Sequence, residues 1–438
     1  MSSTVLEPLA MRNLAVKNRL FRSSLSGRFD NYDGSGTKTR IGWDEKFARG
    51  GVGAIISSNS PVHPRGLIVP GYAHIDRDDR IPFWRELVKR VHEHDCRYIV
   101  QIAYSGRQRD IGGIEYPKGL SSTGKREPLH GFPCERMTVE QIQEVVADFG
   151  RAAYRAREAG ADGVEVHGCN GYLITQFLSS GINDRRDDYG GSLENRARVA
   201  LDVVRAIRAE VGSDYHLQFK ISAEERHNEL LPWKRKGNSL EESVRVCHWL
   251  EEAGVDALHV SSGGAFPHPR NPAGAAPVKD LVRTYDVMLS SGTHTFRNYI
   301  LFRLWPTNRI FKWWWERPSR RGVEGINLPL AKAVKEAVSV PVICAGGFQT
   351  QSVISQAVAD GACDAVSIAR PLLANPDLPL LFAEGLDKAP KPCTYCNKCL
   401  VNFIENPLGC YEESRYASPE EMVRTILAMA YESDPNGV

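Results

Sequence analysis

Three polar residues, His167, Asn170 and Tyr172, lie at the end of an apolar stretch in the segment VEVHGCNGY (residues 164–172). His167 and Asn170 can each donate a hydrogen bond, so together they can hold one carbonyl or nitro oxygen and stabilise the negative charge that grows on it during a reduction. Tyr172 can deliver a proton. A single histidine or asparagine at such a place is more often structural, but all three at this spacing favour a catalytic site.

A second group of reactive residues lies near the end of the chain. Four cysteines, Cys393, Cys396, Cys399 and Cys410, have the spacing C-x2-C-x2-C-x10-C. Four thiolates this close together suit an iron–sulfur cluster or a structural zinc ion. The other six cysteines are scattered along the chain, and we expect them to be free thiols.

Strand-like and helix-like stretches alternate along the whole chain, which is typical of a parallel sheet wrapped by helices. The predicted strands are residues 18–24, 53–57, 98–102, 163–167, 216–221, 257–261, 341–345 and 365–369. Eight such strands predict a (β/α)8 barrel. A doubly wound open sheet is the alternative, but residues 23–27 (SSLSG) follow the first strand in place of Gly-x-Gly-x-x-Gly. The clearest predicted helix spans residues 138–159, with a capping box formed by Thr138 and Gln141.

A phosphate site is predicted where the last two strands of this barrel end. Gly346 and Gly347 follow the seventh strand, and Ala369 and Arg370 end the eighth. In many barrels the loops at these two places expose backbone N–H groups to a phosphate, close to the start of a helix. The Arg370 guanidinium would add a bidentate contact.

The segment from Val164 to Arg196 resembles the old yellow enzyme family of FMN-dependent oxidoreductases. In that family the fourth barrel strand ends in His-x-x-Asn-x-Tyr, followed by Phe-Leu-Ser and by Asn-x-Arg-x-Asp-x-Tyr-Gly-Gly-Ser, and all of these elements are present. The resemblance covers about residues 5–416. It implies that NADH or NADPH reduces FMN at N5 and leaves. An α,β-unsaturated carbonyl compound held by His167 and Asn170 then takes a hydride on its β-carbon, while Tyr172 protonates the α-carbon.

The same resemblance implies flavin contacts on other strands. Ser24 and Ser26 match the segment beneath the isoalloxazine ring, although Ser26 also suits an ordinary turn. Asn59, after the second predicted strand, lies at a position that is close to the flavin in the family. Gln101 offers a donor and an acceptor to the pyrimidine edge. Lys220 lies where the family has a basic residue beside flavin N1 and O2. If this lysine instead had only a structural role, it would need an acidic neighbour, which the sequence does not identify.

The cysteine motif is similar to the segment that follows the barrel in trimethylamine dehydrogenase and 2,4-dienoyl-CoA reductase. That resemblance implies a 4Fe-4S cluster, with zinc as the alternative. Those relatives continue into a further nucleotide-binding domain, whereas this chain ends at Val438. The predicted organisation is an FMN-binding barrel over residues 1–390, a cysteine-rich metal-binding segment over 391–416 and a tail over 417–438.

Residues 283–321 match no pattern of this family. They form a long insert after the sixth predicted strand, rich in arginine and aromatic residues and poor in acidic ones. Tryptophan favours the boundary between water and lipid, and basic residues favour anionic headgroups, so peripheral membrane contact is one interpretation. A substrate lid or a subunit contact in a homo-oligomer is the other. We expect the insert to lie over the catalytic face, with Trp313, Trp314 and Trp315 partly exposed.

The overall composition limits the remaining classes of function. The 438 residues carry a formal net charge of +2 with no extended run of basic residues, which argues against nucleic-acid binding. The start of the chain lacks the pattern of a secretory signal, and no apolar run has the length of a membrane span. We therefore expect a cytoplasmic protein.

The sequence thus predicts an FMN-dependent NAD(P)H oxidoreductase that reduces the C=C bond of a small enone-like substrate. One alternative is a dehydrogenase that oxidises an amine or alicyclic substrate and passes electrons through the cysteine-bound cluster to an electron-carrier protein. The other is a non-catalytic module that binds flavin or metal.

Overall fold

The computed structural model describes residues 4–109, 116–225 and 237–431. Within these residues eight parallel strands close into a barrel in chain order, because the last strand pairs with the first. The barrel strands are β3 (Leu20–Arg22), β4 (Ala54–Ile56), β6 (Arg97–Ala103), β9 (Gly163–Gly168), β10 (His216–Ser222), β11 (Ala257–Ser261), β12 (Val342–Ala345) and β13 (Ala365–Ile368). All eight predicted strands and the (β/α)8 barrel are confirmed.

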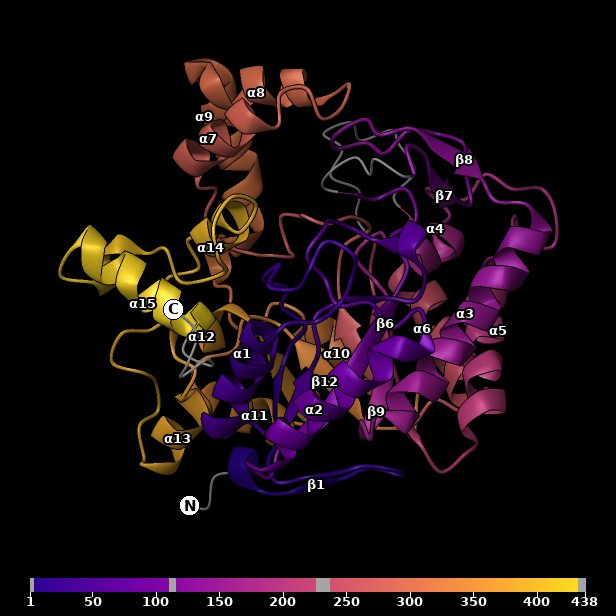
Figure 1. Cartoon of the computed structure of the whole chain (residues 1–438), viewed down its shortest axis with the longest axis horizontal. Coiled ribbons are helices and arrows are strands. Elements are labelled where there is room, and N and C mark those ends of the chain that lie inside the picture. Colours follow the sequence, from indigo (N-terminus) through magenta and orange to yellow (C-terminus); the bar gives the residue numbers. More distant parts are fainter. Residues whose placement is uncertain (1–3, 110–115, 226–236, 432–438) are drawn as a thin grey trace.

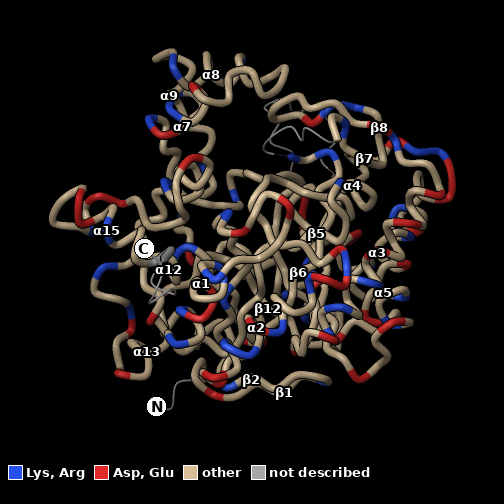
Figure 2. Tube along the Cα trace, viewed as in Figure 1, with Lys and Arg blue, Asp and Glu red and all other residues tan. Residues whose placement is uncertain are grey.

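Helices surround the barrel and connect its strands (Figure 1). They are α1 (Lys38–Arg49), α2 (Ile81–His92), α3 (Val139–Glu158), α4 (Leu173–Leu178), α5 (Leu193–Val211), α6 (Leu240–Glu252), α10 (Leu328–Lys335), α11 (Gln351–Ala359), α12 (Arg370–Ala374) and α13 (Leu378–Ala383). The predicted capping box of α3 is present: the Thr138 hydroxyl accepts from the Gln141 backbone N–H, and the Gln141 side chain accepts from the Thr138 backbone N–H. Lysines and arginines alternate with acidic residues over these outer helices (Figure 2).

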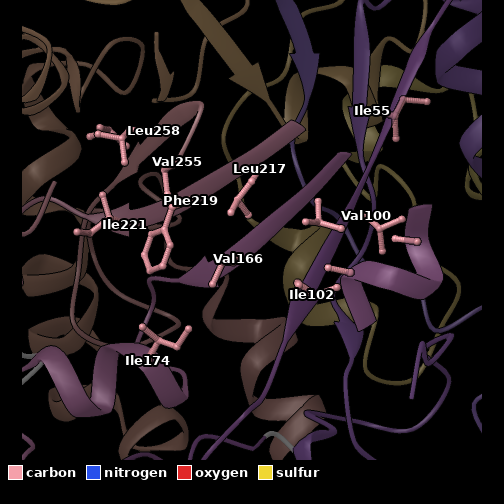
Figure 3. Packing of buried hydrophobic residues seen from close by; sticks show 14 of the residues in the cluster. Ile55, Val100, Ile102, Val166, Ile174, Leu217, Phe219, Ile221, Val255 and Leu258 are labelled. Atoms are coloured by element: carbon pink, nitrogen blue, oxygen red, sulfur yellow. The ribbon is translucent and has the colours of Figure 1, made fainter. Parts of the chain in front are cut away.

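Successive residues of each strand face opposite sides, which separates two layers of side chains. The outward residues, among them Val100, Val166, Leu217 and Phe219, are fully buried against the helices (Figure 3). Burying each such side chain contributes about 1.5–3 kcal/mol. The inward residues at the start of the strands are apolar, and the antiparallel pair β1 (Leu9–Ala10) and β2 (Ala15–Val16) packs against them and closes that end of the barrel.

The insert and the five residues before it form three helices, α7 (Val278–Val287), α8 (Thr295–Arg303) and α9 (Trp305–Glu316), followed by a 3-10 turn, η4 (Arg317–Arg321). Figure 1 shows these helices at the opposite end of the barrel from the β1–β2 pair, on the side to which the strands run. Trp313 is 52% exposed, but Trp315 is only 8% exposed, so the expectation that Trp315 is exposed was wrong. Its indole packs in the aromatic interior of the insert, 5.7 Å from the Phe311 ring.

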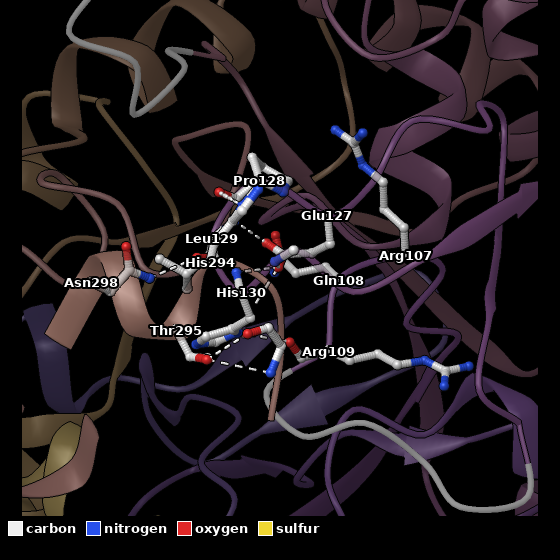
Figure 4. A network of polar contacts seen from close by, with 12 residues as sticks. Arg107, Gln108, Arg109, Glu127, Pro128, Leu129, His130, His294, Thr295 and Asn298 are labelled. Atoms are coloured by element: carbon white, nitrogen blue, oxygen red, sulfur yellow. Dashed lines mark hydrogen bonds and ion pairs between the residues drawn. The ribbon is translucent and has the colours of Figure 1, made fainter. Parts of the chain in front are cut away.

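The insert also contacts the opposite side of the barrel mouth. Asn298 Nδ2 donates to the Leu129 carbonyl oxygen over 2.7 Å, and the His294 backbone N–H donates to that of His130 over 2.9 Å (Figure 4). Residues 127–131 belong to the connection between the short strands β7 (Gly119–Ser121) and β8 (Cys134–Arg136). The insert, which follows the sixth barrel strand β11, is therefore joined to the β7–β8 connection, which follows the third barrel strand β6.

The C-terminal part of the chain contains α14 (Lys398–Asn402), the turn η5 (Glu413–Arg415) and α15 (Pro419–Tyr431). Residues 432–438 of the predicted tail lie outside the described residues. Across the described ranges, none of the helices is long and apolar enough to span a bilayer.

Candidate functional site

His167 is the next-to-last residue of β9, at the mouth of the barrel. Its Nδ1 lies 3.1 Å from Nδ2 of Asn59. An amide NH2 group can only donate, so Nδ1 accepts and the proton of the neutral ring is on Nε2. Burial and, to a smaller extent, the charge of Lys220 lower the pKa of His167 to about 3. The imidazole is therefore neutral at physiological pH and offers an Nε2–H donor.

Asn170 is held on three sides. Its backbone has a φ of 61°, a left-handed conformation that asparagine tolerates better than most residues. Its backbone N–H donates to the Ser222 hydroxyl over 3.2 Å, and its carbonyl oxygen accepts from the Gln108 side chain over 2.9 Å. Asn271 Nδ2 donates to Asn170 Oδ1 over 2.7 Å. This orientation leaves the Asn170 NH2 group as the part of the side chain that can bind another molecule.

Tyr172 precedes α4 and is 7% exposed. Its ring centroid lies 4.7 Å from that of His167, at an interplanar angle of 52°. The ring packs against a small apolar cluster that includes Ile68, Val69 and Tyr72. The three predicted catalytic residues are therefore neighbours, and each is fixed by its surroundings.

A buried polar network that the sequence analysis missed lies one layer below His167. The carboxylate of Glu165 accepts from Gln101 Nε2 at 2.6 Å, from His259 Nδ1 at 2.7 Å and from the Gln218 side-chain amide. The other nitrogen of His259 lies 2.6 Å from the Ser367 hydroxyl. Burial alone would raise the pKa of Glu165, but the interaction with His259, the positive charge of Lys220 and the hydrogen bond from Gln101 hold it at about 2.

Lys220 is buried and pairs in register with His167 on the neighbouring strand. The acidic neighbour that the structural alternative required is Glu165, whose pKa the lysine lowers. Within the described part of the chain, no hydrogen bond or ion pair to the Lys220 ammonium is found. Lys220 therefore has a nearby counter-charge and still has donors that can bind a ligand.

Two buried acceptors at the barrel mouth have no hydrogen-bond donor among the described residues. They are Oε1 of Gln101 and Oδ1 of Asn59, and the amide nitrogens of the same side chains are bonded to Glu165 and His167. A buried acceptor without a donor costs about 1–3 kcal/mol. These atoms suit a bound group that presents N–H donors, as the pyrimidine edge of a flavin does.

The predicted phosphate turn follows β12. Gly347 has a φ of 72°, and a Cβ on it would approach Val323 Cγ1 to 2.9 Å, so only glycine fits without strain. Among the described residues, no acceptor is found for the backbone N–H groups of Gly346 and Gly347. The turn therefore presents unpaired donors of the kind that bind phosphate.

The flavin contacts predicted after the first and eighth strands, Ser24, Ser26 and Ala369, make fewer side-chain contacts. Ser24 and Ser26 are partly buried in the segment after β3, and their hydroxyls have no hydrogen bond within the described ranges. Ala369 precedes α12, where its backbone N–H and that of Arg370 begin a helix.

Arg370 lies against the cysteine-rich segment. Its Nη1 donates to the Ala273 carbonyl oxygen over 2.7 Å and to the Asn397 side chain, and its guanidinium lies 5.4 Å from the Tyr395 ring centroid. The Tyr395 hydroxyl donates to the Gly347 carbonyl oxygen. Arg370 therefore reaches the phosphate turn through Tyr395 rather than by a direct contact.

The four cysteines of the motif line one pocket together with Arg370. Burial raises the pKa of Cys396 to about 11 and also raises the pKa of Cys393 and Cys399, while the Arg370 charge opposes this rise for the latter two. These three thiols are therefore protonated unless a cation is bound. No group of three Cys, His, Asp or Glu side chains in the described ranges is arranged to hold a single metal ion. The six scattered cysteines are free and buried, as expected.

Comparison with protein families gives a match to the model described as the NADH:flavin oxidoreductase / NADH oxidase family over residues 4–287 and 314–389. The unmatched residues 288–313 lie inside the insert. An NADH oxidase of Thermoanaerobacter brockii is 30% identical over 429 residues, covering 94% of this chain and 58% of that protein. An N,N-dimethylglycine/sarcosine dehydrogenase of Chromohalobacter salexigens is 28% identical over 399 residues, covering 90% of this chain and 50% of that protein.

Among solved structures, a 2-naphthoyl-CoA reductase in complex with 2-naphthoyl-CoA superimposes with a TM-score of 0.78 at 26% identity. The alignment covers 99% of this chain and 58% of that one. The chain thus spans between half and three fifths of the length of these relatives.

Proposed function

Because the chain belongs to the NADH:flavin oxidoreductase / NADH oxidase family, we propose that it is an FMN-dependent NAD(P)H oxidoreductase that reduces the C=C bond of an α,β-unsaturated carbonyl compound or a related acceptor. The observation that carries this proposal is the pair of donors, His167 Nε2–H and the Asn170 NH2 group, at the mouth of the barrel. Each donor is oriented by a second asparagine, Asn59 for His167 and Asn271 for Asn170.

These two donors suit a substrate oxygen that gains negative charge. Preorganised donors stabilise such charge without reorganising during the reaction, and removing one of them typically costs about 3–4 kcal/mol of transition-state stabilisation. The lowered pKa of His167 keeps its imidazole neutral, so His167 acts on this oxygen as a hydrogen-bond donor and not as a cation. Tyr172, beside His167, is the proposed proton donor to the substrate carbon.

The residues of the barrel mouth fit FMN. Gln101 and Asn59 supply buried acceptors, Lys220 supplies a cation, and Gly346 and Gly347 supply N–H donors for a phosphate. Ser24, Ser26, Ala369 and Arg370 complete the proposed set. Bound FMN would supply the redox centre, accepting a hydride from NADH or NADPH and donating it to the acceptor. The protein residues bind and orient the reactants and move the proton.

A direct test combines cofactor identification with ligand binding. Freshly purified protein should release FMN on denaturation, and its absorption spectrum should change when a phenol, which resembles the enolate of the acceptor, is added. Release of FAD, or of no flavin, would refute the proposal. FMN that neither NADH nor NADPH reduces would favour the non-catalytic module.

We also propose that the four cysteines bind a 4Fe-4S cluster, with zinc as the alternative. Support comes from their shared pocket and from the Arg370 guanidinium, whose charge favours the thiolate forms of Cys393 and Cys399. Protein prepared without oxygen should contain iron and sulfide. Zinc alone, at one ion per chain, would instead make the segment a structural clamp.

A dehydrogenase that works in the opposite direction is the second candidate. One of the relatives carries the name of a dimethylglycine/sarcosine dehydrogenase, and the cysteine pocket lies next to Tyr395, which contacts the turn at Gly347. Such an enzyme would oxidise an amine and pass electrons through the cluster to a carrier protein. Reduction of the bound flavin by a secondary or tertiary amine, but not by NADH or NADPH, would decide for it.

The exposed surface of the insert supports an additional proposal, peripheral membrane contact. Trp305 is 68% exposed, Ile310 60% and Phe296 59%, and arginines lie between them. These side chains would enter the headgroup region, and the arginines would contact anionic lipid. Sedimentation with anionic vesicles at low salt tests this. Protein that stays in solution would leave a lid or a homo-oligomer contact as the function of this surface.

A further inference from the structure

A second pocket, separate from His167 and Lys220, lies between the insert and the barrel. Its volume is about 950 Å³, which is within the range of sites that bind small molecules. Three segments form its walls: residues 268–270 after β11, residues 314–321 at the end of the insert, and residues 322–329 before and at the start of α10.

The wall formed by the insert carries an unbalanced positive charge. Arg317, Arg320 and Arg321 line the pocket, and none of the three has an ion pair within the described ranges. Arg270 adds a fourth guanidinium. The one carboxylate in the lining, that of Glu324, accepts hydrogen bonds from the backbone N–H groups of Gln349 and Thr350, so it is committed to the start of α11.

Two of the arginines share one aromatic neighbour. The guanidinium groups of Arg317 and Arg320 each lie 5.9 Å from the centroid of the Trp313 ring. The Ser319 hydroxyl, between them in the sequence, accepts from the Gly274 backbone N–H over 2.8 Å and ties this turn to the segment after β11. Like charges gathered on one wall repel one another, and a bound polyanion would relieve that repulsion.

The aromatic part of the pocket lining indicates which kind of anion would fit. Trp314 faces the pocket beside the arginines and offers an aromatic surface on which a base can stack. Several guanidinium groups together with an indole suit a ligand that combines clustered phosphates with an aromatic base. We propose that this pocket binds the phosphorylated adenosine diphosphate arm of a substrate, either the 2′-phosphorylated arm of NADPH or the 3′-phosphorylated arm of a coenzyme A thioester.

The pocket is connected to the candidate active site through one short turn. His268, in the pocket wall, exchanges backbone hydrogen bonds of 2.8 and 2.7 Å with Asn271. Asn271 in turn donates to Asn170 Oδ1. A ligand anchored by the arginines would therefore have its reacting end near Asn170. This last step rests on the proposed function; the binding of the nucleotide arm does not.

Calorimetric titration tests the proposal on the purified full chain at about 0.15 M salt, where long-range attraction is screened. The probes are adenosine 2′,5′-bisphosphate, adenosine 3′,5′-bisphosphate and inorganic pyrophosphate. We expect one bisphosphate to bind, and the double substitution Arg317→Gln/Arg320→Gln to weaken it at least tenfold. Arg303→Gln/Arg309→Gln removes the same charge from the insert outside the pocket and should change the affinity less than twofold.

The identity of the tighter bisphosphate distinguishes the two sources: the 2′,5′ isomer indicates NADPH and the 3′,5′ isomer indicates the thioester. No binding, equal loss in both double variants, or pyrophosphate binding as tightly as the nucleotides would overturn the proposal. The flavin content of the same samples separates this failure from a failure of the proposed function. A protein that carries FMN but binds no nucleotide refutes only the pocket, and the reverse result refutes only the oxidoreductase.

Discussion

The Glu165→Gln substitution should destabilise the barrel by removing a charge that three donors surround. The carboxylate accepts from Gln101, Gln218 and His259. The drop in its pKa from the ordinary 4.5 to about 2 corresponds to about 3 kcal/mol of stability at neutral pH. A glutamine has a single acceptor oxygen, so at least one donor would face its NH2 group. The cost of an unsatisfied buried group, about 1–3 kcal/mol, agrees with this magnitude.

The effect of Glu165→Gln on stability should depend on pH. The pKa of Glu165 is depressed in the folded state, so its contribution is complete above pH 4.5 and is lost as the pH falls towards 2. Thermal unfolding should therefore show a midpoint lower by roughly 3 °C for Glu165→Gln between pH 5 and 8. The two proteins should converge below pH 4.5, because a protonated carboxyl group resembles an amide. Glu210→Gln, on the exposed side of α5, is the control and should leave the midpoint unchanged. Equal midpoints at pH 7, or a difference that persists undiminished at pH 3, would refute the argument.

Three further predictions concern the site itself. His167→Ala and Asn170→Ala should each weaken phenol binding at least tenfold in a spectral titration, while reduction by nicotinamide stays within about twofold; intact phenol binding in both would remove these residues from the acceptor site. Tyr172→Phe should slow stopped-flow reoxidation of the reduced enzyme by an enone but not by a quinone, which needs no carbon protonation; equal slowing of both would make this tyrosine structural. Arg370→Ala should weaken FMN retention in equilibrium dialysis more than it lowers the unfolding midpoint, whereas unchanged retention would assign the arginine to the cysteine pocket alone.

The fold could be predicted from the sequence because its signals are local. Each barrel strand is a short apolar stretch between polar turns, and the capping box of α3 involves residues three positions apart. The β1–β2 pair escaped prediction because its strands are two residues long. Its role depends on packing against the apolar inward residues of strands far along the chain, such as Ile99 and Ile343.

The network around Glu165 could not be predicted for a related reason. Its partners Gln101, Gln218 and His259 are separated from it by 64, 53 and 94 residues, and each occupies the same layer only because of the strand register. The sequence of one strand shows a single polar residue among apolar neighbours, and it does not indicate which residue of another strand will bond to it. The acidic neighbour of Lys220 was missed for the same reason, although it lies only two residues before His167 in the sequence.

Hydrogen bonds join the cysteine-rich segment to the predicted phosphate turn after β12. Gln349, two residues after Gly347, accepts from the Cys393 backbone N–H over 2.9 Å and donates to the Cys393 carbonyl oxygen over 3.2 Å. Tyr395 adds the hydroxyl contact to Gly347, and Arg370 lies over its ring. The turn proposed to bind phosphate is therefore held by the segment proposed to bind metal. Because each contact joins a side chain of one segment to a backbone group of the other, disorder in one segment removes partners from the other. The two proposed cofactors should then stabilise each other's sites even without an exchange of electrons between them.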